Sequence, residues 1–290
     1  MKTAIVTDSA AYLPPKLIEE YNITVVPITV IFDNQAYLEN IDMDSPTFFE
    51  RMRNDNELPT TSQITLGQME ATYDALADQG FDEIISIHLS AGISSFFNNL
   101  LVFVKDYKRV KVYPFDSKVA SAGEANLALL AAYMVNNGHS ASEIMPKLEE
   151  LRDSTHTLFI VDDLKHLLRT GRISNSSAFV GNLLRIKPIL TFNDEGQIIA
   201  ISKERTMKKA FNKLFADFKE TTKSTDYPIR AAVLDANNLE SSDAWRAEFR
   251  KEFPGVPVNT SHLGPVVCVH TGENTMGLIW SKDWRELANK

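Results

Sequence analysis

Apolar runs of strand length alternate with segments of helical spacing from the first residues of the chain. TAIVTD is followed by PPKLIEEYN, EIISIHL by SSFFNNLLVFVKDY, and VKVYPFDS by ANLALLAAYMVNNG. The longer β-branched run ITVVPITVIF reads as one strand with an irregularity at Pro27. Strands in such continuous apolar runs are usually buried on both faces, between layers of helices. The alternation therefore predicts an α/β protein whose N-terminal part is a mostly parallel sheet with flanking helices.

The second half of the chain has a different order of elements. KPILTFNDEGQIIAIS predicts two strands around a tight turn at Asn193–Gly196. A helix from about Met207 to Lys223, the strand IRAAVLD, a helix near Trp245 and a final hairpin in PVVCVHTGENTMGLIW follow. We expect a second α/β domain with a mixed sheet. The N-terminal domain should span residues 1–154 and the C-terminal domain residues 155–290.

Composition excludes several classes of protein. The net charge of −8, from 30 basic and 38 acidic residues, argues against broad binding of nucleic acid or anionic membranes. Cys268 is the one cysteine, so no internal disulfide is possible and a reducing compartment is expected. No run approaches the roughly 18 apolar residues of a membrane span, and the first residues do not form a signal peptide. These features predict a cytoplasmic protein without stable membrane insertion.

Hydroxyl groups gather in the segment PTTSQIT, residues 59–65. Thr65 and Gln68 have the spacing of a capping box for the next helix. Thr61 and Ser62 are therefore not needed as caps. A polar surface loop is the simpler interpretation of these two residues, and a ligand-binding loop is the other.

A second polar segment, LSAGISS at residues 89–95, follows a strand expected at the centre of the sheet. Ligands of open α/β sheets lie beyond the carboxyl ends of the strands. A helix beginning there offers free amides to a carboxylate or phosphate, and Gly92 permits close approach of the backbone. Ser94 would add a hydroxyl donor. Alternatively, Ser94 or Ser95 only caps the helix. The segment has neither a Walker lysine nor the GxSxG pattern of hydrolases.

His270 lies between an apolar run and a glycine-containing turn. A lone histidine is more often structural than catalytic, and the scattered histidines show no spacing typical of a metal site. A Ser–His–acid triad stays open, because triads are not local in sequence. Asp8, Asp116 and Asp162 each follow a strand and could supply the acid.

Basic residues recur in three neighbouring segments, HLLRTGRIS, LLRIKPIL and KERTMKK. They could receive phosphate or an acidic partner, or form a solvated face. The residues concerned are Arg169, Arg172, Arg185, Lys187 and Arg205.

Seven segments taken in order resemble the DegV family. They are TDSAAYLP, PTTSQ, LSAGIS, FDSK, VDDLKHLLRTGRIS, IKPIL and GPVVCVHTG, and they span the chain from Thr7 to Gly277. The chain is similar in particular to the fatty-acid-binding subunits of a bacterial fatty acid kinase system. This resemblance implies a two-domain α/β protein that is not itself an enzyme and needs no cofactor or metal. It also implies that a bound long-chain fatty acid is presented to the kinase and becomes an acyl phosphate for phospholipid synthesis.

The resemblance assigns roles to single residues. It implies that the carboxylate is bound by Thr61, Ser62, Ser94 and His270. Independently of the resemblance, Phe96 and Phe97 begin a helix whose apolar face could line the acyl chain. Arg172 and Arg205 match basic positions of the family and are candidates for docking the kinase or for handling phosphate.

The chain departs from the family pattern at three places. Ser95, Phe96 and Phe97 replace a glycine and more polar residues, Glu273–Asn274 replaces a Pro-Gly turn, and Thr170 replaces a glycine. Two rival functions remain beside lipid binding. One is a hydrolase or acyltransferase that uses Ser94 and His270. The other is a protein that binds a different small anion, such as a sugar phosphate.

Overall fold

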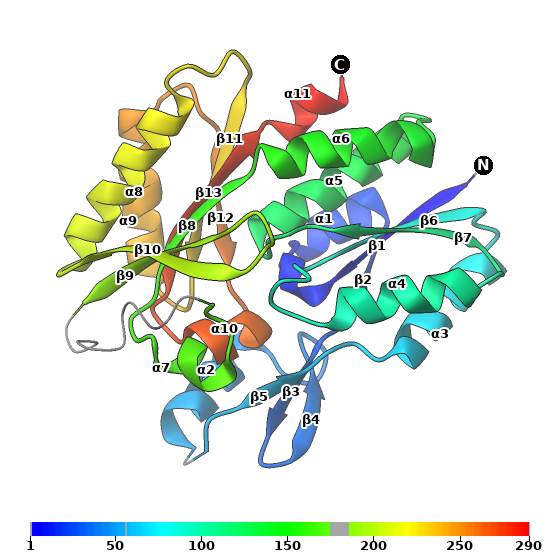
Figure 1. Cartoon of the computed structure of the whole chain (residues 1–290), viewed down its shortest axis with the longest axis horizontal. Coiled ribbons are helices and arrows are strands. Elements are labelled where there is room, and N and C mark those ends of the chain that lie inside the picture. The colour runs from blue at the N-terminus through cyan, green and yellow to red at the C-terminus, as the bar shows by residue number, and fades with distance from the viewer. Residues whose placement is uncertain (1, 56, 175–185, 290) are drawn as a thin grey trace.

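The N-terminal half is built around a parallel four-stranded sheet. Figure 1 shows the computed structural model of the chain, which describes residues 2–55, 57–174 and 186–289. The strand order of this sheet is β2-β1-β6-β7, and all three pairings are parallel. The strands are β1 (Thr3–Asp8), β2 (Ile23–Val26), β6 (Glu83–His88) and β7 (Lys111–Asp116). The predicted parallel sheet is therefore confirmed.

Helices cover both faces of this sheet, as its apolar runs predict. Ala4 and Val6 of β1 point into a core shared with α3 and α4, whereas Ile5 points into a core shared with α1, α5 and α6. Successive strand residues face opposite sides, so a fully apolar strand needs both layers. The helices are α1 (Pro15–Tyr21), α3 (Leu66–Asp78), α4 (Phe96–Asp106), α5 (Ala122–Asn136) and α6 (Ala141–Asp153). A short 3₁₀ turn, Ser9–Ala11, follows β1.

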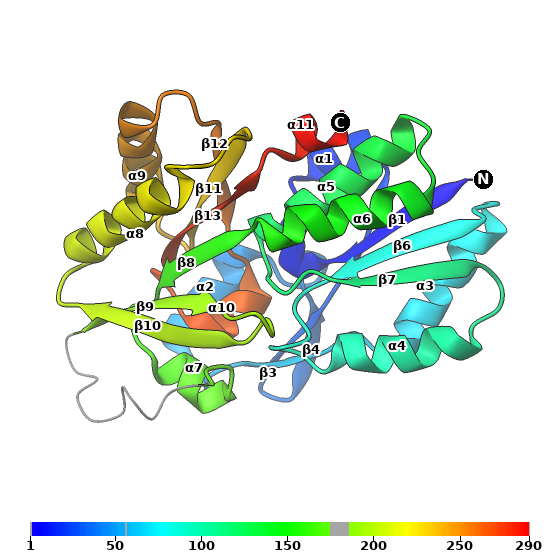
Figure 2. The same cartoon turned by 45° about the horizontal axis from the view of Figure 1, so that its top comes forward.

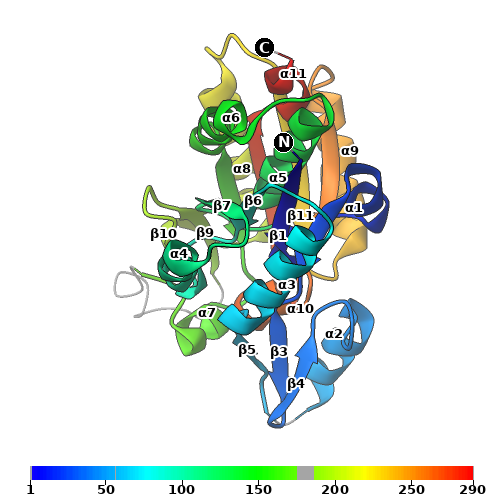
Figure 3. The ribbon, with the colours of Figure 1, turned by 90° about the vertical axis from the view of Figure 1, so that its right-hand side faces the viewer.

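A small antiparallel sheet projects from the N-terminal half, together with one helix (Figure 3). Its elements are β3 (Thr29–Phe32), β4 (Gln35–Leu38), β5 (Thr60–Ser62) and α2 (Ser45–Asn54). The prediction of one strand through Pro27 is wrong, because β2 and β3 belong to different sheets. Proline has no N–H to donate to a ladder, and here it marks the point where the chain leaves the parallel sheet.

The C-terminal half holds a mixed six-stranded sheet in the order β10-β9-β8-β13-β11-β12. Of these pairings only β11 with β12 is parallel. The strands are β8 (His156–Ile160), β9 (Lys187–Phe192), β10 (Ile198–Glu204), β11 (Ile229–Asp235), β12 (Val258–His262) and β13 (Met276–Lys282). The helices are α7 (Lys165–Thr170), α8 (Met207–Thr222), α9 (Leu239–Glu252), α10 (Pro265–Thr271) and α11 (Trp284–Ala288). The mixed sheet and the turn between β9 and β10 are confirmed.

The predicted final hairpin is wrong in its first half. Residues 265–271 form α10, and only β13 is a strand. Pro265 occupies the first turn of the helix, where a missing N–H costs nothing. The amides of Val266 and Val267 are bound by Glu39 and Tyr12 from the other half of the chain. Tertiary contacts therefore override the strand propensity of this valine-rich segment.

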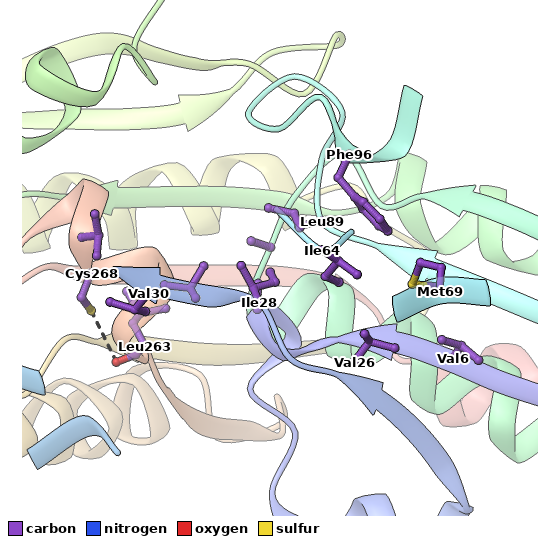
Figure 4. Packing of buried hydrophobic residues seen from close by; sticks show 14 of the residues in the cluster. Val6, Val26, Ile28, Val30, Ile64, Met69, Leu89, Phe96, Leu263 and Cys268 are labelled. Atoms are coloured by element: carbon purple, nitrogen blue, oxygen red, sulfur yellow. Dashed lines mark hydrogen bonds between the residues drawn. The ribbon is translucent and has the colours of Figure 1, made fainter. Parts of the chain in front are cut away.

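The two halves share one hydrophobic core. Leu263 and Cys268 pack in the same cluster as Val30 and Ile28 (Figure 4). Figure 2 shows the β9–β10 hairpin reaching toward the end of the parallel sheet. There, Ser90 donates a hydrogen bond to the Gly196 carbonyl at 2.7 Å.

The domain boundary at residue 154 stays a prediction. The C-terminal helix α11 returns to the N-terminal half, where Trp284 packs against Tyr21 and Tyr133. Among the helices of the described residues, none has both the length and the apolar character required to cross a membrane.

Candidate ligand-binding site

A cavity of about 340 Å³ lies where the two halves meet. Its walls are mostly apolar and come from both halves, including Ile28, Ile64, Leu89, Phe96, Phe159, Leu234, Leu263 and Val266. Ile28, Ile64, Leu89, Phe96 and Leu263 are visible together in Figure 4. The volume falls within the range typical of small-molecule sites. Such a chamber favours a ligand with a substantial apolar body.

The structure brings the four predicted carboxylate-binding residues to this one cavity. Thr61, Ser62, Ser94 and His270 all line it. Thr61 and Ser62 lie on β5, Ser94 lies in the loop after β6, and His270 lies in the last turn of α10. The exposed side chains of Ser62, Gln63 and Ser95 show that this polar part of the wall meets the surface. The cavity therefore has a polar mouth and an apolar interior.

Thr61 and His270 form a hydrogen-bonded pair. The Thr61 hydroxyl oxygen and His270 Nε2 are 2.9 Å apart, and Nδ1 of the same ring has no hydrogen-bond partner among the described residues. Burial lowers the pKa of His270 to about 3, helped by the positive charges of Arg172 and Arg169. A neutral imidazole gains no charge at the mouth. It can donate one hydrogen bond and accept another.

Ser94 has a hydroxyl proton available for a ligand. Its oxygen accepts a hydrogen bond from the amide of Phe96, the first residue of α4, at 3.2 Å. Its backbone amide donates to the carbonyl of Ser90. The loop can approach the β9–β10 turn because Gly92 carries no side chain, and a Cβ there would lie 2.4 Å from the Gly196 backbone. Ser94 lines the cavity, and its role in binding a carboxylate stays a prediction. Ser95 stands at the N-cap position of α4, but its side chain makes no capping hydrogen bond.

Two arginines of the predicted basic segments lie at the site. Arg172 lines the cavity, and its guanidinium also donates to the carbonyl of Thr170. Arg169 donates to the carbonyls of Pro59 and Val269, so it ties α7 to the segment before β5 and to α10. Within the described ranges, Arg172 is the basic lysine or arginine side chain that lines the cavity and could face an anionic head group.

The other basic residues have different positions. Arg205 is exposed immediately before the Thr206 cap of α8 and is not part of the cavity wall. Lys187 is paired with Asp162. Arg185 lies outside the described residues.

The two phenylalanines of the predicted acyl-chain wall separate. Phe96 lines the cavity, whereas Phe97 is buried but is not part of the described lining. Both begin α4, on which successive side chains diverge by the helical repeat. One aromatic ring therefore borders the cavity directly at this position.

Two residues that support the site from outside the cavity wall were not assigned a role from the sequence. Glu39 and Tyr12 bind the Val266 and Val267 amides at the start of α10, at 2.8 and 3.0 Å. Gly264 leaves room for them, because a Cβ there would be 2.5 Å from the Tyr12 ring. They fix the helix that carries His270. The TDSAAYLP motif includes Tyr12, but only the fold shows what it holds.

The deeper wall also contains hydroxyl groups that sequence reasoning missed. Ser121 lies beside Ser261 with the two hydroxyl oxygens 3.1 Å apart, and its backbone has φ of 60°. Thr157 of β8 is a second such residue. Neither stands in a recognisable motif.

The geometry does not assemble a serine nucleophile at the mouth. His270 is paired with Thr61, and no carboxylate supports its Nδ1 in the described part of the chain. A Ser–His–Asp chain does exist elsewhere, formed by Ser86, His88 and Asp8, with distances of 2.7 and 3.1 Å. All three side chains are fully buried and lie outside the cavity wall. A substrate cannot reach them, so this chain is a structural network.

The part of the chain that the structure describes contains no group of three or more histidine, cysteine, aspartate or glutamate residues placed to hold a metal ion.

Comparisons with known proteins agree with one another. A model of the DegV family, described as uncharacterised, matches residues 2–283. The chain is 40% identical to protein DegV of Bacillus subtilis over 281 residues, which cover 97% of this chain and 99% of that protein. It is 40% identical to a DegV domain-containing protein of Halalkalibacterium halodurans over 279 residues, 96% of this chain and 98% of that protein.

Solved structures of the same kind superpose closely. DegV of Bacillus subtilis, described as a fatty acid binding protein, gives a TM-score of 0.89 at 38% identity and covers 97% of this chain and 99% of its own. A fatty-acid-binding protein from Thermus thermophilus gives 0.90 at 29% identity, with 97% and 100% covered.

Proposed function

The chain belongs to the DegV family, and we propose that it binds one long-chain fatty acid in the cavity between its two halves. The single observation that carries this proposal is the division of the cavity into an apolar interior and a hydroxyl-rich mouth. A fatty acid has the same division, with one carboxylate at the end of an apolar chain. The fatty acid binding described for the Bacillus subtilis and Thermus thermophilus structures supports it.

The energetics favour this class of ligand. Each buried methylene contributes about 0.8 kcal/mol, so a long chain supplies most of the affinity. The carboxylate then needs only to be satisfied, because an unpartnered buried charge is costly. The Thr61–His270 pair offers one hydrogen-bond donor to a ligand, because its other proton lies in the bond between the two residues. Ser94 offers a second donor, and Arg172 offers a charged one. Ser62 lies at the same mouth and belongs to the proposed carboxylate site.

We also propose that the protein carries its ligand to a separate fatty acid kinase and does not catalyse the phosphorylation itself. Two observations support this role. The polar residues lie where the cavity meets the surface, so the bound carboxylate would be near solvent. No histidine–carboxylate pair stands at the mouth among the described residues. The acyl phosphate would form on the exposed carboxylate. The proposed location of the protein is the cytoplasm, where ATP is available to the kinase.

Arg205 is the proposed contact with the kinase. It is exposed, it lies away from the cavity wall, and the described residues give it no ion pair. Arg172 could serve the carboxylate, the kinase, or both in turn, since it lines the mouth.

The first experiment is extraction of lipid from the purified protein, followed by mass spectrometry. We expect about one fatty acid per chain. The lipid-free protein should bind added stearic acid and should not bind a sugar phosphate. A protein that contains no lipid and does not take up any fatty acid would overturn the proposal.

A second experiment tests the carrier role. Loaded protein is mixed with a fatty acid kinase and ATP, and acyl phosphate is trapped with hydroxylamine. We expect a product only when both proteins are present. Product formed by this protein alone, or release of alcohol from an acyl ester, would favour the hydrolase or acyltransferase instead.

A further inference from the structure

The ring of Phe96, which borders the cavity, rests on a buried histidine. The ring centroids of Phe96 and His88 are 4.9 Å apart and the planes are 80° from each other, an edge-to-face contact. His88 is fully buried at the end of β6 and does not line the cavity. Edge-to-face pairs of this kind have a preferred geometry, so the orientation of His88 affects that of Phe96.

Both ring nitrogens of His88 are held. Nδ1 lies 3.1 Å from Asp8 Oδ2, and Nε2 lies 2.7 Å from the Ser86 hydroxyl. Asp8 Oδ2, which also accepts from the Leu89 amide, accepts from Nδ1, so Nε2 is left to accept from Ser86. Tyr73 donates its hydroxyl proton to Ser86 at 2.7 Å. The proton of His88 is then on Nδ1 and points to Asp8. Every group in this chain has one role, which fixes the ring in a single orientation.

Asp8 is itself held independently of the histidine. Its two carboxylate oxygens accept hydrogen bonds from the amides of Ala10 and Leu89, each at 3.0 Å. Leu89 begins the polar loop that leads to Ser94. The network is therefore anchored in the backbone on both sides of the site.

Phe96 is coupled directly to the mouth. Its amide donates to the hydroxyl of Ser94, so the serine and the aromatic ring are fixed relative to each other at the beginning of α4. Ser94 and Phe96 both line the cavity, and this hydrogen bond joins them. A carboxylate bound by Ser94 would therefore have its first carbons near Phe96.

We propose that His88 is a positioning residue that holds Phe96 and Ser94 as a rigid wall, so that the site rejects fatty acids branched next to the carboxylate. This inference rests on the proposed fatty acid binding. A close-packed wall that cannot yield has no room for an extra methyl group at that position. Without His88, the Phe96 ring can shift and make room for the methyl group.

The test compares stearic acid with its α-methyl-branched analogue in direct binding to the lipid-free full chain. The wild type should prefer the unbranched acid. In His88→Leu the preference should fall by about five-fold, because the edge-to-face contact and both hydrogen bonds of the ring are lost. Asp8 keeps its two amide donors in this variant. Ser86→Ala, which removes only the Nε2 contact, should give a smaller change in the same direction.

Two controls separate positioning from general destabilisation. Tyr73→Phe removes a buried hydroxyl but leaves the Ser86–His88 bond, so it should keep the wild-type preference. In a Phe96→Leu background, His88→Leu should have no further effect on the preference. An unchanged preference in both His88→Leu and Ser86→Ala would overturn the inference, as would equal effects with and without Phe96. If the wild type binds neither acid, the proposed function itself fails.

Discussion

The hydroxyl oxygen of Thr61 and Nε2 of His270 lie 2.9 Å apart, although the two residues are 209 positions apart in the chain. Thr61 lies on the small N-terminal sheet, and His270 lies in the last turn of a helix of the C-terminal half. The pair therefore joins the two halves at the mouth of the cavity. Because the imidazole is neutral, the pair gives the mouth hydrogen-bonding capacity without adding charge.

Removing the Thr61 hydroxyl should weaken fatty acid binding. In Thr61→Val the side chain keeps nearly the same volume but loses its donor, and His270 loses its partner. We expect the affinity for stearic acid to fall by about five- to ten-fold, measured by calorimetry. Ser94→Ala should cause a comparable loss. Thr65→Val, which alters the nearby capping box outside the cavity wall, is the control and should leave the affinity unchanged.

Replacing Arg172 should affect binding more than replacing Arg205. Arg172→Gln removes the cation at the mouth, and a charge-assisted hydrogen bond is roughly twice as strong as a neutral one. We expect the affinity for stearic acid to fall by about ten-fold or more. The difference between the two proteins should shrink at high salt, because salt screens the charge of Arg172 in the wild type. Arg205→Gln should bind stearic acid like the wild type and should lower only the rate of the coupled kinase reaction. Equal affinities for all three proteins would show that Arg172 does not meet the carboxylate.

The buried His270 should make the folded protein sensitive to acid. Its pKa is about 3 in the folded protein, below the ordinary value of 6.5, so the unfolded chain takes up a proton first. Its contribution to stability is therefore full above about pH 6.5 and is lost as the pH falls toward 3. Urea unfolding of His270→Gln should show a weaker dependence on pH between those values. An identical dependence in both proteins would contradict the assignment.

Glu39 should give the free energy of unfolding the opposite dependence on pH. Burial raises its pKa from 4.5 to about 7, although Ser9, the Val266 amide and Tyr12 partly offset this by hydrogen bonding. The folded protein then holds the proton more tightly than the unfolded chain. Its contribution to stability is full below about pH 4.5 and is lost as the pH rises through 7. The full shift corresponds to about 3 kcal/mol.

Glu39→Gln tests this dependence. The neutral amide should flatten the dependence of the free energy of unfolding on pH between about 5 and 8. Glu39→Ala should instead destabilise the protein at every pH, since it leaves the Val266 amide without its acceptor. If Glu39→Gln keeps the wild-type slope, another group causes it.

Local patterns predicted the elements whose neighbours are close in sequence. The capping box at Thr65 and the turn at Asn193–Gly196 both form as expected. They depend on hydrogen bonds within a few residues, so the sequence alone contains the information. The family resemblance also predicted that Thr61, Ser94 and His270 lie together, and all three line one cavity.

Elements held by distant contacts could not be predicted in this way. The valine-rich sequence of α10 predicts a strand. In the structure it is a helix whose first amides are bound by Glu39 and Tyr12. The separation of Phe96 from Phe97 depends on where α4 begins, which no motif marks. The support of Phe96 by His88 needs the packing of β6 against α4. For α10 the deciding contacts join residues more than 200 positions apart, and for Phe96 they depend on three-dimensional packing that no local pattern records.

The double anchoring of α10 has a consequence for how this protein can diverge. Its first amides are bound by the N-terminal half, and its last residues carry His270 to a partner on that same half. A recombination event that joined the first half of one relative to the second half of another would have to match both ends of this helix at once. The two halves are therefore expected to be inherited together, and chimeras should recover binding only when Tyr12, Glu39 and Thr61 come with a compatible helix.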